Sequence, residues 1–409
     1  MAAGHHSTPS VTGLTCRREP HDNLETNAYT LPMSARIVIL GAGFGGLELS
    51  ARLSSALGDG ASVTLIDRNE AFVFGFSKFE LMFGRQDLEG VRSYYRDIVN
   101  PGVQFRREIV TSIDPIARRV VTDRNSCDAD ELVVALGAEY DFSVPPGFSE
   151  GGYEFYSIDG ALRLRDVLPS FRSGAIIVGV LGEPFKCPPA PCEAAMLLDE
   201  WLAERGLRSE TQISVVSPWG TPVPASPSAS KAILDRFAER NIAFVPDQVV
   251  TSLDPAKQIA FLRDGRSLPY DLFLGIPIHR APAVAEDSGL AIDGWIPVDK
   301  ANLATRFPHV YAVGDVTSAP VPKAGVFAES AARAVAEHLI AQLRGGGSPK
   351  PYDGAGSCFI EFGEHKVGRV DADFLTGPSV TAPFYGPSLE MAEEKREFAS
   401  TRRRHWFGH

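Results

Sequence analysis

A glycine-rich turn between a short apolar strand and a helix constrains the fold of this chain most strongly. The apolar run at residues 36–40 leads into Gly-Ala-Gly-Phe-Gly-Gly at 41–46, and helical spacing follows over 47–53. Gly41 makes the tight turn, Gly43 lets backbone N–H groups approach a pyrophosphate, and Gly46 lets the helix pack on the strand. A second apolar strand, residues 62–66, ends in Asp67, where a ribose-binding carboxylate belongs. The pattern predicts a Rossmann-like dinucleotide site.

Composition narrows the classes of protein that this chain can belong to. The net charge of −11 over 409 residues leaves no basic face for nucleic acid. The five cysteines are too few and too scattered for a secreted disulfide framework. No segment approaches the ~20 apolar residues of a membrane span. We expect a cytoplasmic protein, at most peripheral to the inner face of a membrane, with no metal site and with residues 1–33 as a disordered tail.

A second strand–turn–helix unit follows, but its turn has the wrong chemistry for a pyrophosphate. The strand at 173–180 and the helix at 193–202 are joined by a segment with four prolines, which lack the N–H donors that a phosphate needs. The next strand, 212–216, ends at Ser217 rather than at an acid. Two separate requirements for a nicotinamide dinucleotide therefore fail together. We predict a nicotinamide-type domain that has lost its nucleotide and gained other chemistry.

Two later strands extend the pattern into a family resemblance. The run at 131–137 closes on Gly137, and the run at 309–315 ends in Gly314-Asp315. Over about residues 34–370 the chain resembles the pyridine nucleotide-disulfide oxidoreductases, flavoproteins with two dinucleotide-binding domains. The resemblance implies noncovalent FAD, with the Gly-Asp pair on its ribityl chain and phosphate. A helix at 330–339 and Lys323 would then stabilise the negative charge of reduced flavin.

The proline-rich turn carries a narrower resemblance. Phe-Lys-Cys-Pro-Pro-Ala-Pro at 185–191 resembles the cysteine loop of sulfide:quinone oxidoreductases and of the flavoprotein subunit of flavocytochrome c sulfide dehydrogenase. That resemblance implies a redox pair of Cys187 with Cys358, attacked as a disulfide by hydrosulfide, with two electrons passing to FAD. Lys186 and nearby helix N-termini are expected to lower the thiol pKa. The implied donor is sulfide or a related small thiol or persulfide.

The chain also departs from that family in three places. Residues 154–160 hold no third cysteine, and Gly75 stands where the flavocytochrome attaches its FAD through a cysteine. The tail from Leu389 is charged rather than apolar, so the acceptor stays open between a quinone and a protein. An Arg and Trp cluster in this tail is expected to give at most weak contact with an anionic membrane. A homodimer is one assembly that we expect, and the oligomeric state stays open.

Several residues and functions remain as alternatives. Cys187 can be read as an inert buried cysteine and Cys192 as its local redox partner, although a helix-start role fits Cys192 better. His279 and Glu329 are candidate proton carriers, against the simpler reading of a solvated loop histidine. The competing functions are a type II NADH:quinone dehydrogenase-like flavoenzyme and a non-turnover FAD redox sensor. NADH should reduce the flavin in the first, and neither donor should do so in the second.

The sequence therefore predicts an α/β chain with two Rossmann-like dinucleotide-binding domains and a short C-terminal domain. The predicted division is an FAD-binding domain in two parts (34–145 and 280–350), a degenerate NAD-type domain with the redox cysteine (146–279) and a C-terminal capping domain (351–409). The predicted site residues are Cys187 and Cys358 for catalysis, and Gly41, Gly43, Gly46, Asp67, Gly137, Gly314, Asp315 and Lys323 for the cofactor.

Overall fold

The computed structural model describes Met1 and residues 34–408, so the tail predicted at the N-terminus and Cys16 lie outside the described residues. From Ser34 onward the chain forms one unit by its contacts. The division of that unit into the domains predicted above stays a prediction.

The first sheet carries the glycine-rich turn. Its strands lie in the order β19-β9-β1-β2-β5, and every neighbouring pair is parallel. Because both faces of such a sheet are covered, its central strands are mostly apolar, as the buried β1 residues Ile37 and Ile39 illustrate. The bounds are β1 (Ala35–Leu40), β2 (Ala61–Asp67), β5 (Val103–Arg107), β9 (Glu131–Val134) and β19 (Val310–Ala312).

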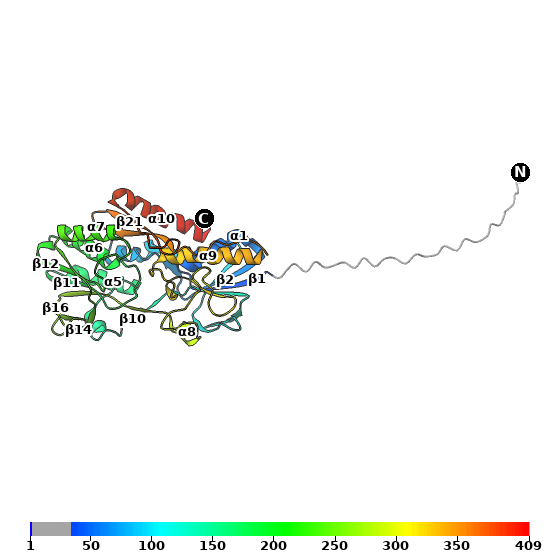
Figure 1. Cartoon of the computed structure of the whole chain (residues 1–409), viewed down its shortest axis with the longest axis horizontal. Coiled ribbons are helices and arrows are strands. Elements are labelled where there is room, and N and C mark those ends of the chain that lie inside the picture. The colour runs from blue at the N-terminus through cyan, green and yellow to red at the C-terminus, as the bar shows by residue number, and fades with distance from the viewer. Residues whose placement is uncertain (2–33, 409) are drawn as a thin grey trace. The chain divides into compact units, whose positions relative to one another are not determined.

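Two helices that are far apart in the sequence cover this sheet together. Helix α1 (Phe44–Leu57) follows the glycine-rich turn, and α9 (Gly325–Leu343) packs along it. Figure 1 shows them side by side, α1 in blue and α9 in orange. Helix α9 begins at Gly325, five residues before the start that the sequence suggested, because residues 325–329 continue its apolar face into the core.

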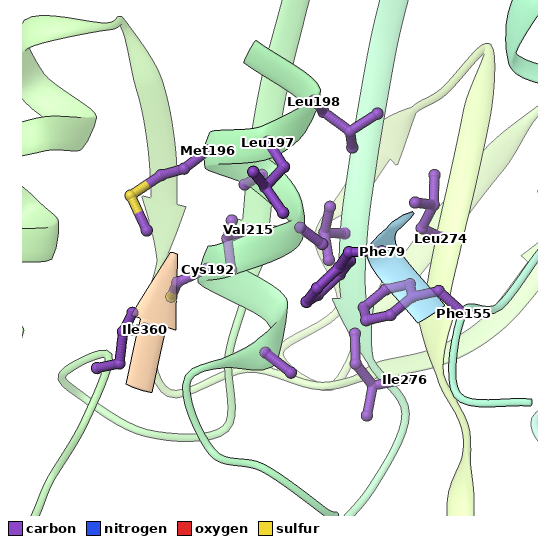
Figure 2. Close-up of a cluster of buried hydrophobic side chains, with 14 of the residues drawn as sticks. Phe79, Phe155, Cys192, Met196, Leu197, Leu198, Val215, Leu274, Ile276 and Ile360 are labelled. Carbon is purple, nitrogen blue, oxygen red and sulfur yellow. The ribbon is translucent and has the colours of Figure 1, made fainter. Parts of the chain in front are cut away.

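The second sheet is also parallel and carries the proline-rich turn. Its order is β13-β12-β11-β17, and α6 packs on β11 and β12. Figure 2 shows the buried side chains of this region, with Cys192, Met196, Leu197 and Leu198 on α6. The bounds are β11 (Gly174–Val180), α6 (Ala190–Glu204), β12 (Thr211–Val216), α7 (Pro227–Glu239), β13 (Ile242–Val245) and β17 (Leu272–Ile276).

Two parallel sheets with crossover helices confirm the predicted α/β class. A two-stranded antiparallel ribbon, β10 (Glu139–Asp141) with β18 (Ile278–Arg280), pairs the segment after β9 with the segment after β17. It therefore joins the exits of the two sheets and brings their turns toward one another.

A third, antiparallel sheet follows these two. Strands β20 (Ala355–Glu361), β21 (Val367–Asp373) and β22 (Phe384–Ser388) precede α10 (Leu389–Phe407), and β20 packs on α6 and α9. Within residues 34–408 no helix is both long and apolar enough to cross a membrane.

The other elements are short, and η1 (Gly58–Gly60), η2 (Tyr95–Asp97), η3 (Leu168–Ser170) and η4 (Arg208–Glu210) are among them. The rest are β3 (Ala71–Val73), α2 (Ser77–Met82), α3 (Leu88–Val91), β4 (Arg92–Tyr94), β6 (Val110–Asp114), β7 (Arg119–Thr122), β8 (Ser126–Asp128), α4 (Phe148–Gly151), α5 (Ile158–Val167), β14 (Val250–Asp254), β15 (Ile259–Leu262), β16 (Ser267–Pro269), α8 (Ala283–Asp287) and η5 (Gly314–Val316).

Candidate active site

The glycine-rich turn forms one wall of a cavity of about 610 Å³, which we call the cofactor cavity. Gly41 has φ +100°, and a Cβ there would lie 2.3 Å from Ala135 O, so only glycine fits. A Cβ on Gly46 would lie 1.9 Å from Gly41 O, which explains how the helix packs so close to its strand. A Cβ added at Gly43 would meet no protein atom within 4 Å, and Gly43 lines the cavity. This division of labour is the one that a pyrophosphate site needs.

The other walls of the cofactor cavity come from the end of β2, the segment after β9 and η5. Asp67, Gly137, Gly314 and Asp315 all line it. Asp67 accepts hydrogen bonds from Ala42 N at 2.7 Å and Asn69 N at 2.8 Å, which fixes the carboxylate beside the turn. Since each carboxylate oxygen has further lone pairs, it can still accept hydroxyl donors from a ribose. The chemistry of these walls fits a dinucleotide.

Helix α9 points its N-terminus at the cofactor cavity, but Lys323 does not reach it. Gly325 lines the cavity, and no side chain caps the helix there. The Lys323 ammonium instead donates to Asp315 O at 2.8 Å and Thr317 O at 3.0 Å and lies 3.4 Å from the centroid of the Trp295 ring. Burial lowers the pKa of Lys323 to about 8. Its predicted direct contact with the cofactor therefore has no geometric support.

The proline-rich turn holds Cys187 in an uncommon backbone conformation. Its φ is +55°, in the left-handed region that usually favours glycine. Cys187 N donates to Lys323 O at 2.7 Å, and Cys187 O accepts from Ala190 N at 2.9 Å. Both backbone groups of Cys187 are thus bonded to protein. In the first turn Gly41 N and Ala42 N are bonded to Ile66 O and Asp67, and no side chain caps α1 at Gly43.

The structure brings Cys187 and Cys358 together. Both are half-buried free thiols that line a cavity of about 280 Å³, which we call the thiol cavity. They lie 171 positions apart in the sequence, and β20 supplies Cys358 from the third sheet. Nine residues line both cavities, so the thiols adjoin the cofactor site: Phe44, Phe72, Val73, Lys78, Tyr140, Tyr156, Lys186, Asp315 and Gly325.

Glu193 is a site residue that the sequence reasoning missed. It lies in the first turn of α6, is buried, and has Oε2 3.9 Å from Cys187 Sγ. Its Oε1 accepts from Glu361 N at 3.0 Å. Burial raises the pKa of Glu193 to about 7, while the charge of Lys395 opposes that shift. A carboxyl six residues after a cysteine, on the turn that begins a helix, was the available signal.

Lys186 does not lower the pKa of either thiol, which corrects the expectation for it; the cation that lowers the pKa of Cys187 is Lys395, and burial outweighs it. Burial raises the pKa of Cys187 well above its usual value, and Glu193 and Cys358 add to the shift. Burial likewise raises the pKa of Cys358 to about 12, with Glu193 as the next cause. The Lys186 ammonium points away, donating to Ala138 O at 2.8 Å and lying 4.8 Å from the centroid of the Tyr140 ring.

Two aromatic side chains stack at the second turn. The rings of Phe185 and Trp219 stack at 4.8 Å with an interplanar angle of 20°. Trp219 Nε1 donates to a Glu183 carboxylate oxygen, so the stack is also held by a polar contact. The prolines remove N–H donors from the second turn, and the N–H groups of Lys186 and Cys187 are bonded within the protein.

The other candidates lie away from both cavities. Cys192 is buried on α6 in the second core, and burial raises its thiol pKa, which agrees with a structural role (Figure 2). Glu329 is buried and paired with Arg333 and Arg402. His279 is a buried β18 residue rather than a solvated loop histidine.

Trp406 was expected to help the charged tail to touch a membrane, and the structure contradicts this. It is fully buried and donates from Nε1 to Glu48 at 2.8 Å. Its ring packs 5.3 Å from Phe44 and 5.4 Å from Phe72, measured between centroids. An amphipathic ring can fill a core when its N–H finds a partner, and Glu48 is that partner.

Taken together, two parallel sheets, a glycine cradle and a cysteine-bearing second turn define a dinucleotide-binding oxidoreductase with paired thiols beside its cofactor cavity. The family model "Pyridine nucleotide-disulphide oxidoreductase" matches residues 35–337. The chain belongs to this family, and it is a flavin-dependent oxidoreductase of it.

Similar proteins agree with this assignment. The chain is 25% identical to the mitochondrial sulfide:quinone oxidoreductase of Mus musculus over 85% of this chain and 80% of that protein. It is 29% identical to the alternative NAD(P)H-ubiquinone oxidoreductase C1 of Arabidopsis thaliana over 59% and 51%. The crystal structure of the sulfide:quinone oxidoreductase of Aquifex aeolicus superposes with a TM-score of 0.82 at 22% identity, covering 91% of this chain and 92% of that one.

Proposed function

We propose that this protein is an FAD-dependent oxidoreductase that oxidises sulfide, or a related thiol or persulfide, through Cys187 and Cys358. Its electron acceptor is then a quinone or a protein. The observation that carries the proposal is that these two cysteines line one cavity that shares a wall with the cofactor cavity. The relatives named as sulfide:quinone oxidoreductases support it.

In the proposed chemistry, the reaction begins at a disulfide between the two cysteines. Hydrosulfide attacks one sulfur, which breaks the Cys187–Cys358 bond, forms a persulfide and releases the other sulfur as a thiolate. This exchange moves no electrons out of the sulfur atoms. Taking one hydrosulfide to zero-valent sulfur releases two electrons and one proton. The sulfur would leave on a second hydrosulfide as HSS⁻, the Cys187–Cys358 bond would re-form, and FAD, when bound, would accept the two electrons.

Glu193 is the residue that we propose takes the proton. Its Oε2 lies 3.9 Å from Cys187 Sγ, and its pKa of about 7 matches the pH at which a base must both accept and release a proton. Thiols with raised pKa values need such a base, because their thiolates are scarce at neutral pH.

The electron acceptor is proposed from the lining of the thiol cavity and from the names of the relatives. The thiol cavity is lined mainly by apolar and aromatic side chains, among them Phe359 and Phe398, whose ring centroids lie 5.5 Å apart. Such a lining suits a quinone ring better than a charged nucleotide. The quinone-named relatives favour the same acceptor.

An anaerobic titration with sulfide and, separately, with NADH tests the proposal through flavin absorbance. We expect sulfide to bleach the flavin in the wild type, and Cys187→Ser and Cys358→Ser to slow this by about a thousandfold or more, which corresponds to about 4 kcal/mol of barrier. Cys192→Ala is the matched control, because Cys192 is buried outside both cavities, and it should retain the wild-type rate within about threefold.

The same titration can reject the proposal. Bleaching by NADH but not by sulfide would replace it with the NADH dehydrogenase reading and show that the second turn still binds a nucleotide. Bleaching by neither donor would leave a flavoprotein that does not turn over these substrates. Sulfide bleaching that survives both cysteine substitutions would remove the thiol pair from the mechanism.

A further inference from the structure

The Lys186–Cys187 segment has all four of its backbone polar groups bonded inside the protein. Tyr156 OH donates to Lys186 O at 2.9 Å, and the bonds of Cys187 N and O to Lys323 and Ala190 are described above. The fourth group, Lys186 N, donates to His279 Nε2 at 3.3 Å. His279 is thus the only side-chain acceptor in this set.

The hydrogen bonds fix which nitrogen of His279 carries the proton. Nδ1 lies 2.7 Å from Pro277 O, and a carbonyl can only accept, so Nδ1 is the donor. Nε2 must then carry a lone pair, which the Lys186 N–H uses. A doubly protonated ring would direct one N–H at another and lose this bond.

The surroundings keep the ring neutral. His279 is 4% exposed and pairs with Tyr140 across the β10–β18 ribbon. The rings of Tyr140 and Tyr156 meet it edge-on, with centroids at 4.9 and 5.2 Å. The charged groups that act on it are the cations Lys186, Lys323 and Lys78. Burial first, and these cations next, lower the pKa of His279 to about 3.

We infer that His279 is a positioning residue for the reactive cysteine, holding the Lys186–Cys187 segment in its left-handed turn through a neutral Nε2 acceptor. The turn directs two neighbouring side chains apart, with Cys187 Sγ toward Glu193 and the Lys186 ammonium toward Ala138 O. The inference rests on the proposed function only in taking Cys187 as the reacting sulfur.

This role differs from the proton carrier that the sequence suggested. Both ring nitrogens are engaged with backbone groups, and His279 lines neither the cofactor cavity nor the thiol cavity. A proton carrier needs one nitrogen free to face the reacting atoms.

A pair of amide variants separates the two roles. Gln at position 279 places its oxygen near the Nε2 position, whereas the shorter Asn reaches only the Nδ1 position. We expect His279→Asn to lower the rate of flavin reduction by sulfide about tenfold, and His279→Gln to stay within about threefold of wild type. His338→Gln, on α9 outside both cavities, is the control and should match wild type.

Thiol alkylation gives a readout that does not depend on turnover. Reduced protein is treated with iodoacetamide, and the peptides of Cys187 and Cys192 are quantified by mass spectrometry. In His279→Asn the Cys187 peptide should be alkylated about tenfold faster because the turn is released, while the buried Cys192 stays as slow as in wild type. Equal acceleration of both would indicate general unfolding and overturn the inference.

The pH profile of sulfide-dependent reduction completes the test. Its midpoint should be the same in wild type and His279→Gln, because the histidine stays neutral above about pH 3. A midpoint that disappears in His279→Gln would overturn positioning in favour of proton transfer, and this comparison decides alone if the Asn variant does not fold. If sulfide does not reduce the wild type, the proposed function fails while alkylation still decides the role of His279.

Discussion

The β1–α1 turn and the β11–α6 turn stand at equivalent places in two parallel sheets, yet they use their backbones in opposite ways. The first has glycines at its close approaches, and Gly43 faces open space. The second has prolines, and the N–H groups of Lys186 and Cys187 are bonded to His279 and Lys323. The helices differ as well, since the first turn of α1 carries no acid whereas that of α6 carries Glu193. The two turns therefore differ in their glycines and prolines and in the acid at the start of the helix, which suits the first to a phosphate and the second to a thiol.

The largest expected effect separates packing glycines from ligand-facing glycines in the first turn. Gly41→Ala should lower the free energy of unfolding by about 3 kcal/mol or more, because its Cβ would clash with Ala135 O at a left-handed φ. Gly43→Ala should leave apoprotein stability within about 0.5 kcal/mol but weaken FAD binding about tenfold or more. Thermal melts of apoprotein and flavin fluorescence titrations measure the two. Equal loss of stability in both variants would contradict the open cradle.

A smaller effect, on the rate of flavin reduction, is expected for Glu193 on α6. Glu193→Gln should remove the pH dependence of sulfide-dependent flavin reduction near pH 7 and lower the rate about tenfold to a hundredfold, as for loss of a general base. Stopped-flow reduction from pH 5.5 to 9 measures this, with Glu393→Gln on the exposed face of α10 as control. An unchanged profile would assign the pH dependence to another group.

The raised pKa of Glu193 also leads to a prediction for the stability of the protein. Its folded pKa of about 7 lies above its usual value of 4.5, so the unfolded chain loses the proton first. The wild type should therefore lose stability as pH rises from about 4.5 to 7, and Glu193→Gln should not lose this part. Urea unfolding at pH 5 and pH 8 checks the sign. A wild type that gains stability over this range relative to the variant would refute the raised pKa.

The smallest expected change in stability is at Cys187. Because this residue has φ +55°, Cys187→Gly should gain about 1 kcal/mol of stability, whereas Cys187→Ser should gain nothing. Both should be inactive with sulfide. Denaturant unfolding of the two variants measures this difference in stability. A more stable glycine variant would show that the backbone at position 187 prefers glycine and that the cysteine is kept there for its thiol. A destabilised glycine variant would show instead that Cys187 packing outweighs its backbone strain.

The sequence predicted what depends on local pattern. The Gly41–Gly46 spacing and the apolar strands around it were enough for the first sheet, because a Rossmann turn is defined by residues close in the chain. The prolines of the second turn likewise predict that it holds no pyrophosphate, and this stays a prediction. The Cys187–Cys358 proximity came from resemblance and could not have come from spacing, since Cys187 lies in the β11–α6 turn and Cys358 lies on β20 of the third sheet.

What the sequence missed depends on tertiary packing. Lys323 was expected at the flavin, but its ammonium finds the carbonyls of Asp315 and Thr317. Lys186 was expected to activate its neighbour, but the left-handed turn sends the two side chains in different directions. His279 looked like a loop residue until the β10–β18 ribbon buried it. Side-chain direction and burial are set by segments that no local window contains.

The burial of Trp406 against Phe44 sets an order for biosynthesis. Phe44 begins the helix of the cofactor turn, and Glu48 in the same helix accepts from the Trp406 indole. A ribosome releases the first sheet's opening strand long before residue 406, and domains fold as their parts emerge. Because Phe44 also lines the cofactor cavity, that wall reaches its final packing only after α10 has been made.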